Sequence, residues 1–277
     1  MSVKITTLIE NNQDNNCLLY NEHGLSLYIE ADGKKIMFDT GQSGKFIENA
    51  KKLNITLDEA DYLIISHGHY DHSGGFTRLV KEIGNSYKLV ISEKFFDKKF
   101  SYKEEGYRYT GNSFDNKYLE DNNINVNYIN NDMYNITENI IIASNFERKT
   151  DFEKLNRRFF VEINNKLEAD AFSDEMSLAI KIEKGLLVIL GCSHVGVVNI
   201  LETLSERTNM PIYGIVGGTH LVEADEFRLD ETIKYFKEKD IKIIGVSHCT
   251  GEKAIEKLKI ECKDRFLYNN TGNILEI

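Results

Sequence analysis

Short apolar runs separated by turn residues recur along the whole chain. Runs rich in Ile, Leu and Val are typical of buried β-strands, and apolar residues three or four positions apart are typical of helices. The expected strands lie at residues 3–9, 25–31, 35–38, 62–65, 87–92, 139–144, 158–163, 176–183, 186–190, 212–216, 241–246, 265–268 and 274–277. The expected helices lie at residues 43–53, 76–83, 197–205, 226–238 and 252–260.

This alternation of strands and helices predicts an α/β fold in which helices cover a mixed or parallel sheet. We expect a single domain over residues 1–277, because no linker-like stretch and no repeat divides the chain. Residues 95–135 are rich in Tyr, Asn and Lys and show weak periodicity. We interpret this segment as a solvated excursion or as an insertion or lid that faces the substrate.

Two helix starts carry capping signals. Ser73 is placed to cap the helix predicted to follow it, and Thr56 with Glu59 has the spacing of a capping box. Both signals predict that a side-chain oxygen accepts a hydrogen bond from the backbone of the first turn.

Composition narrows the classes of function. The net charge is −10 and the pI is about 5.3, so the chain lacks the basic surface that nucleic-acid binding needs. Apolar residues make up 41% of the chain, enough for a sizeable core, yet no apolar run approaches the length of a membrane span. We therefore expect no nucleic-acid or membrane partner. An anionic substrate is still compatible with an acidic chain if metal ions supply positive charge at the site.

The cysteines and the N-terminus indicate a cytoplasmic protein. No CxxC pair occurs among Cys17, Cys192, Cys249 and Cys262, and their spacing suggests no disulfide framework. Reduced thiols in the cytoplasm are the simpler interpretation. The first residues have no apolar signal-peptide segment.

One loop gathers an unusual set of side chains. His67, His69, Asp71 and His72 fall within six residues, directly after the apolar run at residues 62–65. Imidazole and carboxylate are ligands that suit zinc, iron or manganese. Buried together, four such groups would need partners. The loop therefore predicts a metal site at a strand end.

Three more histidines follow predicted strands. His194, His220 and His248 each come just after a short apolar strand and just before a helix, whereas His23 lies outside this pattern. A histidine at such a turn can simply bond the backbone. However, strand carboxyl ends gather along one edge of a sheet, where ligands bind. We therefore expect these three side chains to lie near the first loop.

The HxHxDH pattern of residues 67–72 resembles the signature of the metallo-β-lactamase superfamily. Phe38-Asp39-Thr40-Gly41 resembles its first motif, and Ser247-His248 resembles its last. Gly191-Cys192-Ser193-His194 and Gly217-Gly218-Thr219-His220-Leu221, together with the segment after His248, resemble a narrower branch. That branch is labelled dihydropterin ribofuranosyl-aminobenzene phosphate synthase-like.

The resemblance implies a four-layer αββα sandwich with the metal site at the strand ends. It implies two metal ions. Asp39 would not contact them and would instead support the loop that carries the ligands. The implied ligands are His67, His69 and His194 for the first ion, and Asp71, His72 and His248 for the second. This chain departs from the pattern where many relatives have a bridging Asp, because Cys192 falls near that position. Cys192 is then either a thiolate ligand or a buried thiol.

The implied activity is that of a hydrolase or transferase for a small anionic substrate, phosphorylated or pterin-like. Metal binding lowers the pKa of water from about 15.7 to about 7, which gives a nucleophile at neutral pH. Asp71 is expected to align this metal-activated water, and His220 to stabilise negative charge. One or two zinc ions are the expected cofactor, with iron or manganese as alternatives. A di-iron redox protein and a non-catalytic pterin-binding protein are the rival interpretations.

Overall fold

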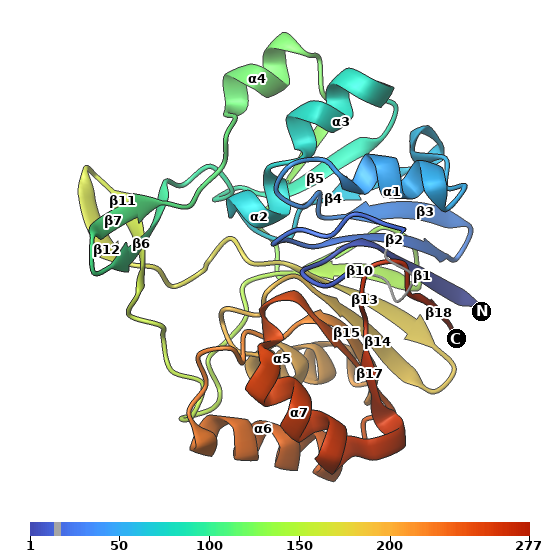
Figure 1. The fold of residues 1–277 in the computed structure, drawn as a ribbon, viewed down its shortest axis with the longest axis vertical. Coiled ribbons are helices and arrows are strands. Elements are labelled where there is room, and N and C mark those ends of the chain that lie inside the picture. Colours follow the sequence, from blue (N-terminus) through green and yellow to red (C-terminus); the bar gives the residue numbers. More distant parts are fainter. Residues whose placement is uncertain (14–17) are drawn as a thin grey trace. The chain divides into compact units, whose positions relative to one another are not determined.

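The computed structural model describes residues 1–13 and 18–277, so the predicted thiol of Cys17 lies outside the described residues. The chain folds into two compact units (Figure 1). The N-terminal unit comprises Ser2–Asn130, Leu155–Asp174 and Asn270–Ile277, and the C-terminal unit comprises Met1, Asn131–Lys154 and Glu175–Asn269. The single domain expected over residues 1–277 stays a prediction.

A mixed sheet forms the centre of the N-terminal unit. In the described part of this unit it has seven strands, in the order β18-β1-β2-β3-β4-β5-β8. Their bounds are β1 (Val3–Ile9), β2 (Ser26–Ala31), β3 (Lys34–Phe38), β4 (Tyr62–Ile64), β5 (Lys88–Ser92), β8 (Val126–Ile129) and β18 (Ile274–Glu276). Strands β3, β4, β5 and β8 run parallel, so their carboxyl ends share one edge.

Helices pack on this sheet through apolar side chains. The helical segments are α1 (Phe46–Lys52), η1 (Leu57–Glu59), α2 (Tyr70–Ser73), α3 (Phe76–Ile83) and α4 (Asn116–Asp121). Phe46 of α1 and Phe76 of α3 belong to the same buried cluster as Met37 and Leu63 of the sheet. Replacing a buried phenylalanine with alanine costs about 3–5 kcal/mol, so this packing fixes the loops between strand and helix.

Both predicted caps are wrong in detail. Ser73 ends α2, and its hydroxyl donates to the carbonyl of His69 at 2.9 Å, so Gly75 precedes α3 instead. The histidine loop forms the short helix α2, and Ser73 is the last residue of that helix, so it cannot cap α3. Thr56 does precede the short turn η1, but its side chain makes no capping hydrogen bond.

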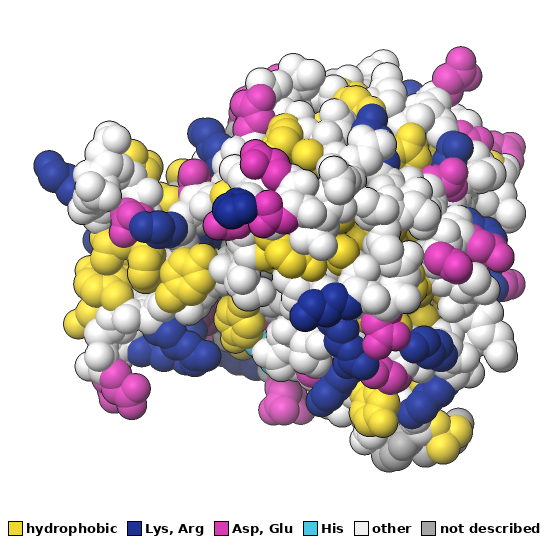
Figure 2. All heavy atoms as spheres, turned by 90° about the horizontal axis from the view of Figure 1, so that it is seen from above, with side chains coloured by type: hydrophobic (Ala, Val, Ile, Leu, Met, Phe, Trp, Pro, Cys, Tyr) yellow, Lys and Arg dark blue, Asp and Glu magenta, His cyan; other side chains and the backbone are white. Residues whose placement is uncertain are grey.

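A second, smaller sheet also belongs to the N-terminal unit. Among the described residues it has four strands, in the order β12-β11-β6-β7. Their bounds are β6 (Lys99–Lys103), β7 (Gly106–Tyr109), β11 (Phe159–Ile163) and β12 (Lys166–Ala169). Tyr102 and Tyr107 are about half exposed, at 50% and 53%. Figure 2 shows hydrophobic side chains on the part of the surface that this sheet forms.

The segment 95–135 therefore contains more regular structure than its weak periodicity predicted. It contributes β6, β7, α4, β8 and a further strand, β9 (Met133–Asn135). These strands are short and face solvent on one side, so they lack a continuous apolar pattern. Its role as an insertion or lid stays a prediction.

The C-terminal unit contains a second large mixed sheet. In the described residues its order is β17-β16-β15-β14-β13-β10-β9. The bounds are β9 (Met133–Asn135), β10 (Ile140–Ala143), β13 (Ser177–Ile182), β14 (Gly185–Leu190), β15 (Ile212–Gly218), β16 (Ile243–Ser247) and β17 (Phe266–Tyr268). Strands β14 to β17 run parallel, with Leu190 beside Gly217 and Gly218 beside Ser247. Three successive strands therefore end in register, and each presents its following loop at the same edge.

Helices link these parallel strands. They are α5 (Val197–Thr208), α6 (Glu226–Glu238), η2 (His248–Thr250), α7 (Glu252–Cys262) and η3 (Lys263–Arg265). No helix in the described residues combines the length and apolar character needed to cross a membrane.

Candidate metal centre

The histidine loop begins directly after β4, at the parallel edge of the N-terminal sheet. Gly68 is required within it, since a Cβ there would lie 2.3 Å from the carbonyl oxygen of Phe95. Its backbone N–H donates to the carboxylate of Asp174 at 2.8 Å. The loop is thus held by close backbone packing and by one buried carboxylate.

Asp39 is the buried carboxylate that orients the histidine side chains. It follows β3, the neighbour of β4, and its backbone lies in the left-handed region at φ 61°. One carboxylate oxygen accepts the N–H of Ser66 at 2.7 Å, and the other accepts the Ser66 hydroxyl at 2.9 Å. The second oxygen also lies 2.6 Å from Nδ1 of His72. Because a carboxylate only accepts, His72 carries its proton on Nδ1 and keeps Nε2 as a lone-pair donor.

The rings of His67 and His69 meet edge to face. Since the Ser66 hydroxyl already donates to Asp39, its oxygen accepts from Nδ1 of His67, 2.9 Å away. Nε2 of His67 then faces Nδ1 of His69 at 3.0 Å. Burial lowers the pKa of His67 well below 6.5, assisted by its histidine neighbours, and burial beside Lys99 lowers the pKa of His69 to about 3. Both rings are therefore neutral at physiological pH, which is the form that binds metals.

Asp71 has a partner that the sequence did not point to. Its carboxylate lies 3.2 Å from Nε2 of His23, the histidine left outside the strand-end pattern, and 3.9 Å from Nε2 of His72. The His23 side chain is half exposed whereas Asp71 is buried. His23 belongs to this cluster because tertiary packing brings its turn to the loop, and local spacing contained no sign of that.

A buried ion-pair network supports the same loop from the small sheet. Lys99 of β6, only 2% exposed, contacts the carboxylates of Asp170 and Asp174 at 2.8 Å each. Burial acts against the charge of Lys99, but the two carboxylates outweigh it and raise its pKa. Asp174 in turn accepts the N–H of Gly68, so the network fixes the backbone between His67 and His69.

In the C-terminal unit the candidate ligands come from separate strand ends. Cys192 and His194 follow β14, His220 follows β15 and His248 follows β16. His220 and His248 lie in the left-handed region at φ 45° and φ 54°, as does Ser193 at φ 64°. Such conformations are costly for residues other than glycine and are found often at functional sites.

Glu175 holds the His194 turn in place. Its two carboxylate oxygens accept the backbone N–H groups of His194 and Val195, at 2.7 and 2.8 Å. The His194 ring lies beside the His220 ring, with 4.2 Å between the centroids. Glu175 was not among the predicted site residues, since an acidic residue before a strand carries no distinctive signal.

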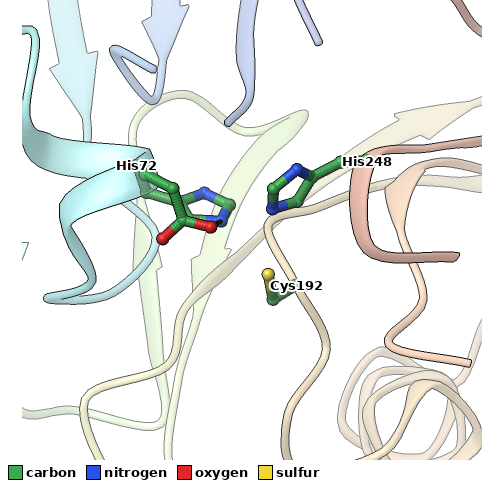
Figure 3. A group of neighbouring side chains, drawn as sticks. His72, Cys192 and His248 are labelled. Carbon is green, nitrogen blue, oxygen red and sulfur yellow. Dashed lines mark ion pairs between the residues drawn. The ribbon is translucent and has the colours of Figure 1, made fainter. Parts of the chain in front are cut away.

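Two thiols lie among these imidazoles. Sγ of Cys192 lies within 4.8 Å of a ring nitrogen of His194 and of one of His248, and Figure 3 shows the thiol directed toward His248. Cys249 donates to the carbonyl of Cys192 at 3.3 Å. Burial opposes ionisation of Cys249, but hydrogen bonds with Cys192 and His220 outweigh it, so its pKa is well below the usual 9.0.

These donors fit a metal ion. Imidazole, carboxylate and thiolate together match the ligands of zinc and of other borderline transition metals. Two nitrogens on one tetrahedral zinc ion lie about 3.3 Å apart, as follows from Zn–N bonds of about 2.0–2.1 Å. The 3.0 Å between Nε2 of His67 and Nδ1 of His69 is close to that separation.

The predicted site residues thus fall into two clusters, one in each unit. The N-terminal cluster contains Asp39, His67, His69, Asp71 and His72, and the C-terminal cluster contains Cys192, His194, His220 and His248. Prediction missed His23, Ser66, Lys99, Asp174, Glu175 and Cys249. Of these, only Ser66 and Cys249 had a usable signal, since each adjoins a predicted histidine.

Comparison with known proteins places these observations in context. A model of the metallo-beta-lactamase superfamily matches residues 19–128. The chain is 31% identical, over 99% of its length and 97% of the relative's, to 7,8-dihydropterin-6-methyl-4-(beta-D-ribofuranosyl)-aminobenzene-5'-phosphate synthase of Methanocaldococcus jannaschii.

Solved structures show the same relationship. Tm1679, described as a metal-dependent hydrolase of the beta-lactamase superfamily, matches with a TM-score of 0.87 and 30% identity over 99% of both chains. A diphosphatase from the PhnP family matches with a TM-score of 0.56 and 14% identity, over 100% of this chain and 98% of that one. The second likeness concerns the fold alone.

Proposed function

The chain belongs to the metallo-β-lactamase superfamily, and on that premise we propose that it is a metal-dependent hydrolase or transferase for a small anionic substrate. The observation that carries this proposal is the buried pair of neutral imidazoles, His67 and His69, whose facing nitrogens lie 3.0 Å apart. A phosphorylated or pterin-like molecule is the proposed substrate class. The name of the Methanocaldococcus jannaschii relative supports it, since that name describes a dihydropterin phosphate.

We assign the ligands to two zinc ions. His67, His69 and His194 are proposed for the first, and Asp71, His72 and His248 for the second. Sγ of Cys192 lies within 4.8 Å of a ring nitrogen of His194 and of one of His248, which supports the proposal that its thiolate would serve as a ligand. Asp39 is proposed as a positioning residue, because its carboxylate fixes the proton of His72 on Nδ1.

When bound, the zinc ions supply a water of lowered pKa and positive charge for anionic oxygens. Asp71 accepts a hydrogen bond from the attacking water and turns its lone pair toward the substrate. His23, 3.2 Å from the Asp71 carboxylate, holds that carboxylate in place. His220 donates a hydrogen bond to the negative charge that develops on the substrate.

Metal analysis and turnover together test this proposal. Protein purified without chelators is assayed against a phosphodiester, a phosphomonoester, a lactone and a pterin phosphate. We expect zinc-dependent turnover of at least one phosphoester. Asp71→Asn should lower kcat by about 10²–10⁴-fold, the usual contribution of a positioned proton-transfer group. Asp121→Asn, which changes an exposed carboxylate on α4, serves as the matched control.

Two results would contradict the proposal. Zinc-loaded protein that hydrolyses none of these compounds, yet binds the pterin tightly, would favour a ligand-binding protein. Iron in the purified protein, with an absorption spectrum that changes on reduction, would favour a redox protein.

A further inference from the structure

Three donors in the C-terminal unit occupy equivalent positions on neighbouring strands. Cys192 is the second residue after β14, His220 the second after β15 and Cys249 the second after β16. These strands are parallel neighbours whose ends are in register, with Leu190 beside Gly217 and Gly218 beside Ser247. The same offset from three aligned strand ends brings the three side chains together.

The three residues already contact one another. A ligand atom from each lies within 4.8 Å of the other two, and all three residues are buried. The Cys249 thiol donates to the carbonyl of Cys192, and the backbone N–H of His220 donates to Sγ of Cys249, each at 3.3 Å. Gly218 makes room for that sulfur, since a Cβ there would lie 2.7 Å from it.

Two thiols and one imidazole form a soft donor set. Thiolates select zinc, copper(I) and similar thiophilic ions over magnesium or calcium. Zinc bound to sulfur at about 2.3 Å and to nitrogen at about 2.0–2.1 Å requires donor atoms about 3.3–3.8 Å apart. The three donor atoms lie within 4.8 Å of one another, which is on the scale of that spacing.

We propose that Cys192, His220 and Cys249 form a distinct site for one thiophilic metal ion, such as Zn²⁺ or Cd²⁺. The site lies wholly within the C-terminal unit and needs no residue of the histidine loop. Cys192 and His220 also belong to the proposed catalytic set. An ion bound here therefore withdraws both from the catalytic set.

Cadmium titration of the reduced, chelator-treated full-length protein tests the proposal. Thiolate-to-Cd²⁺ charge transfer absorbs in the ultraviolet, and its intensity grows with the number of bound thiolates. We expect a two-thiolate band in the wild type. In Cys249→Ser the band should fall to about half and the affinity for Cd²⁺ by at least about tenfold, the lower limit for loss of a supporting metal contact. Cys262→Ser, which changes a buried thiol of α7 outside the cluster, should match the wild type.

His69→Ala separates this site from the proposed function. That variant should retain the two-thiolate band, whereas the catalytic metal content should fall. A band unchanged in Cys249→Ser would overturn the proposal, because only Cys192 would then bind. If Cys249→Ser fails to fold, Cys192→Ser gives the same test. Reduced protein that forms a Cys192–Cys249 disulfide in air but binds no Cd²⁺ would also overturn it.

Discussion

The two clusters of candidate ligands are built in opposite ways. In the N-terminal cluster the ligands follow one another along a single loop, and the carboxylate of Asp39 orients their rings. In the C-terminal cluster the ligands come from the ends of β14, β15 and β16, and the backbone itself is constrained, with His220 and His248 at positive φ. The first arrangement depends on side-chain hydrogen bonds, and the second depends on the register of parallel strands.

This difference predicts where each cluster is vulnerable. Buried hydrogen-bond networks fail when one partner is removed, because the other partners then stay buried without an acceptor. A cluster whose geometry is set by strand register should be less sensitive to substitutions of the residues that support its ligands, as long as the turns keep their conformation. Side-chain substitutions should therefore affect the N-terminal cluster more strongly.

The largest effect is expected from Asp39→Ala. This substitution removes the acceptor of three buried donors. They are the N–H and the hydroxyl of Ser66 and the Nδ1–H of His72. At about 1–3 kcal/mol for each such group, urea unfolding should show a loss of about 4 kcal/mol. Asp39→Asn is the matched control, since asparagine tolerates positive φ and keeps one acceptor oxygen. A wild-type unfolding midpoint for Asp39→Ala would refute the proposed role of this carboxylate.

Lys99→Met should cost slightly less, about 3 kcal/mol, because it leaves two buried carboxylates facing each other without a counter-charge. Lys98→Met removes the neighbouring lysine, which is exposed and pairs with Glu162. That control should change the free energy of unfolding by less than about 1 kcal/mol. If the two variants unfold alike, the Lys99 network does not support the histidine loop.

Glu175→Gln tests the C-terminal cluster and should cost about 2 kcal/mol, because the amide can accept only one of two backbone N–H groups. Glu183→Gln, at an exposed position beside β13, is the control. Metal content should also fall in Glu175→Gln if the turn positions His194. A loss of stability larger than that of Asp39→Ala would reverse the comparison between the clusters.

Counted per pH unit, the smallest effect is a pH dependence of the metal-free protein. The pKa of His69 is about 3 when folded, against about 6.5 when unfolded, so between these values only the unfolded chain binds the proton. The free energy of unfolding is therefore highest above pH 6.5. It should fall by up to about 1.4 kcal/mol per pH unit below that value. Urea titrations of His69→Gln should show a shallower slope than those of the wild type, and equal slopes would contradict this prediction.

The metallo-β-lactamase α/β fold with two mixed sheets could be predicted from the sequence, and the structure confirms it. Helix α6 begins and ends where its pattern predicts, at Glu226 and Glu238. Strands β7 and β12 could not be predicted, because their residues are mostly exposed and have no continuous apolar pattern.

The site residues also differ in how far the sequence could predict them. His67, His69 and His72 could be grouped from spacing alone, since one short loop carries them. Glu175 and His23 could not, because strand pairing and loop packing bring them to their partners from distant parts of the chain. Cys249 required the register of β14, β15 and β16, which no local pattern contains.

The most direct test of the central claim, that the chain is a metal-dependent enzyme, is the metal content of protein purified without chelators. Mass spectrometry of bound metals is compared for the wild type, His69→Ala and His248→Ala. We expect each variant to lose at least one transition-metal ion per chain, because each substitution removes a proposed metal ligand. Wild-type metal content in either variant would contradict the account.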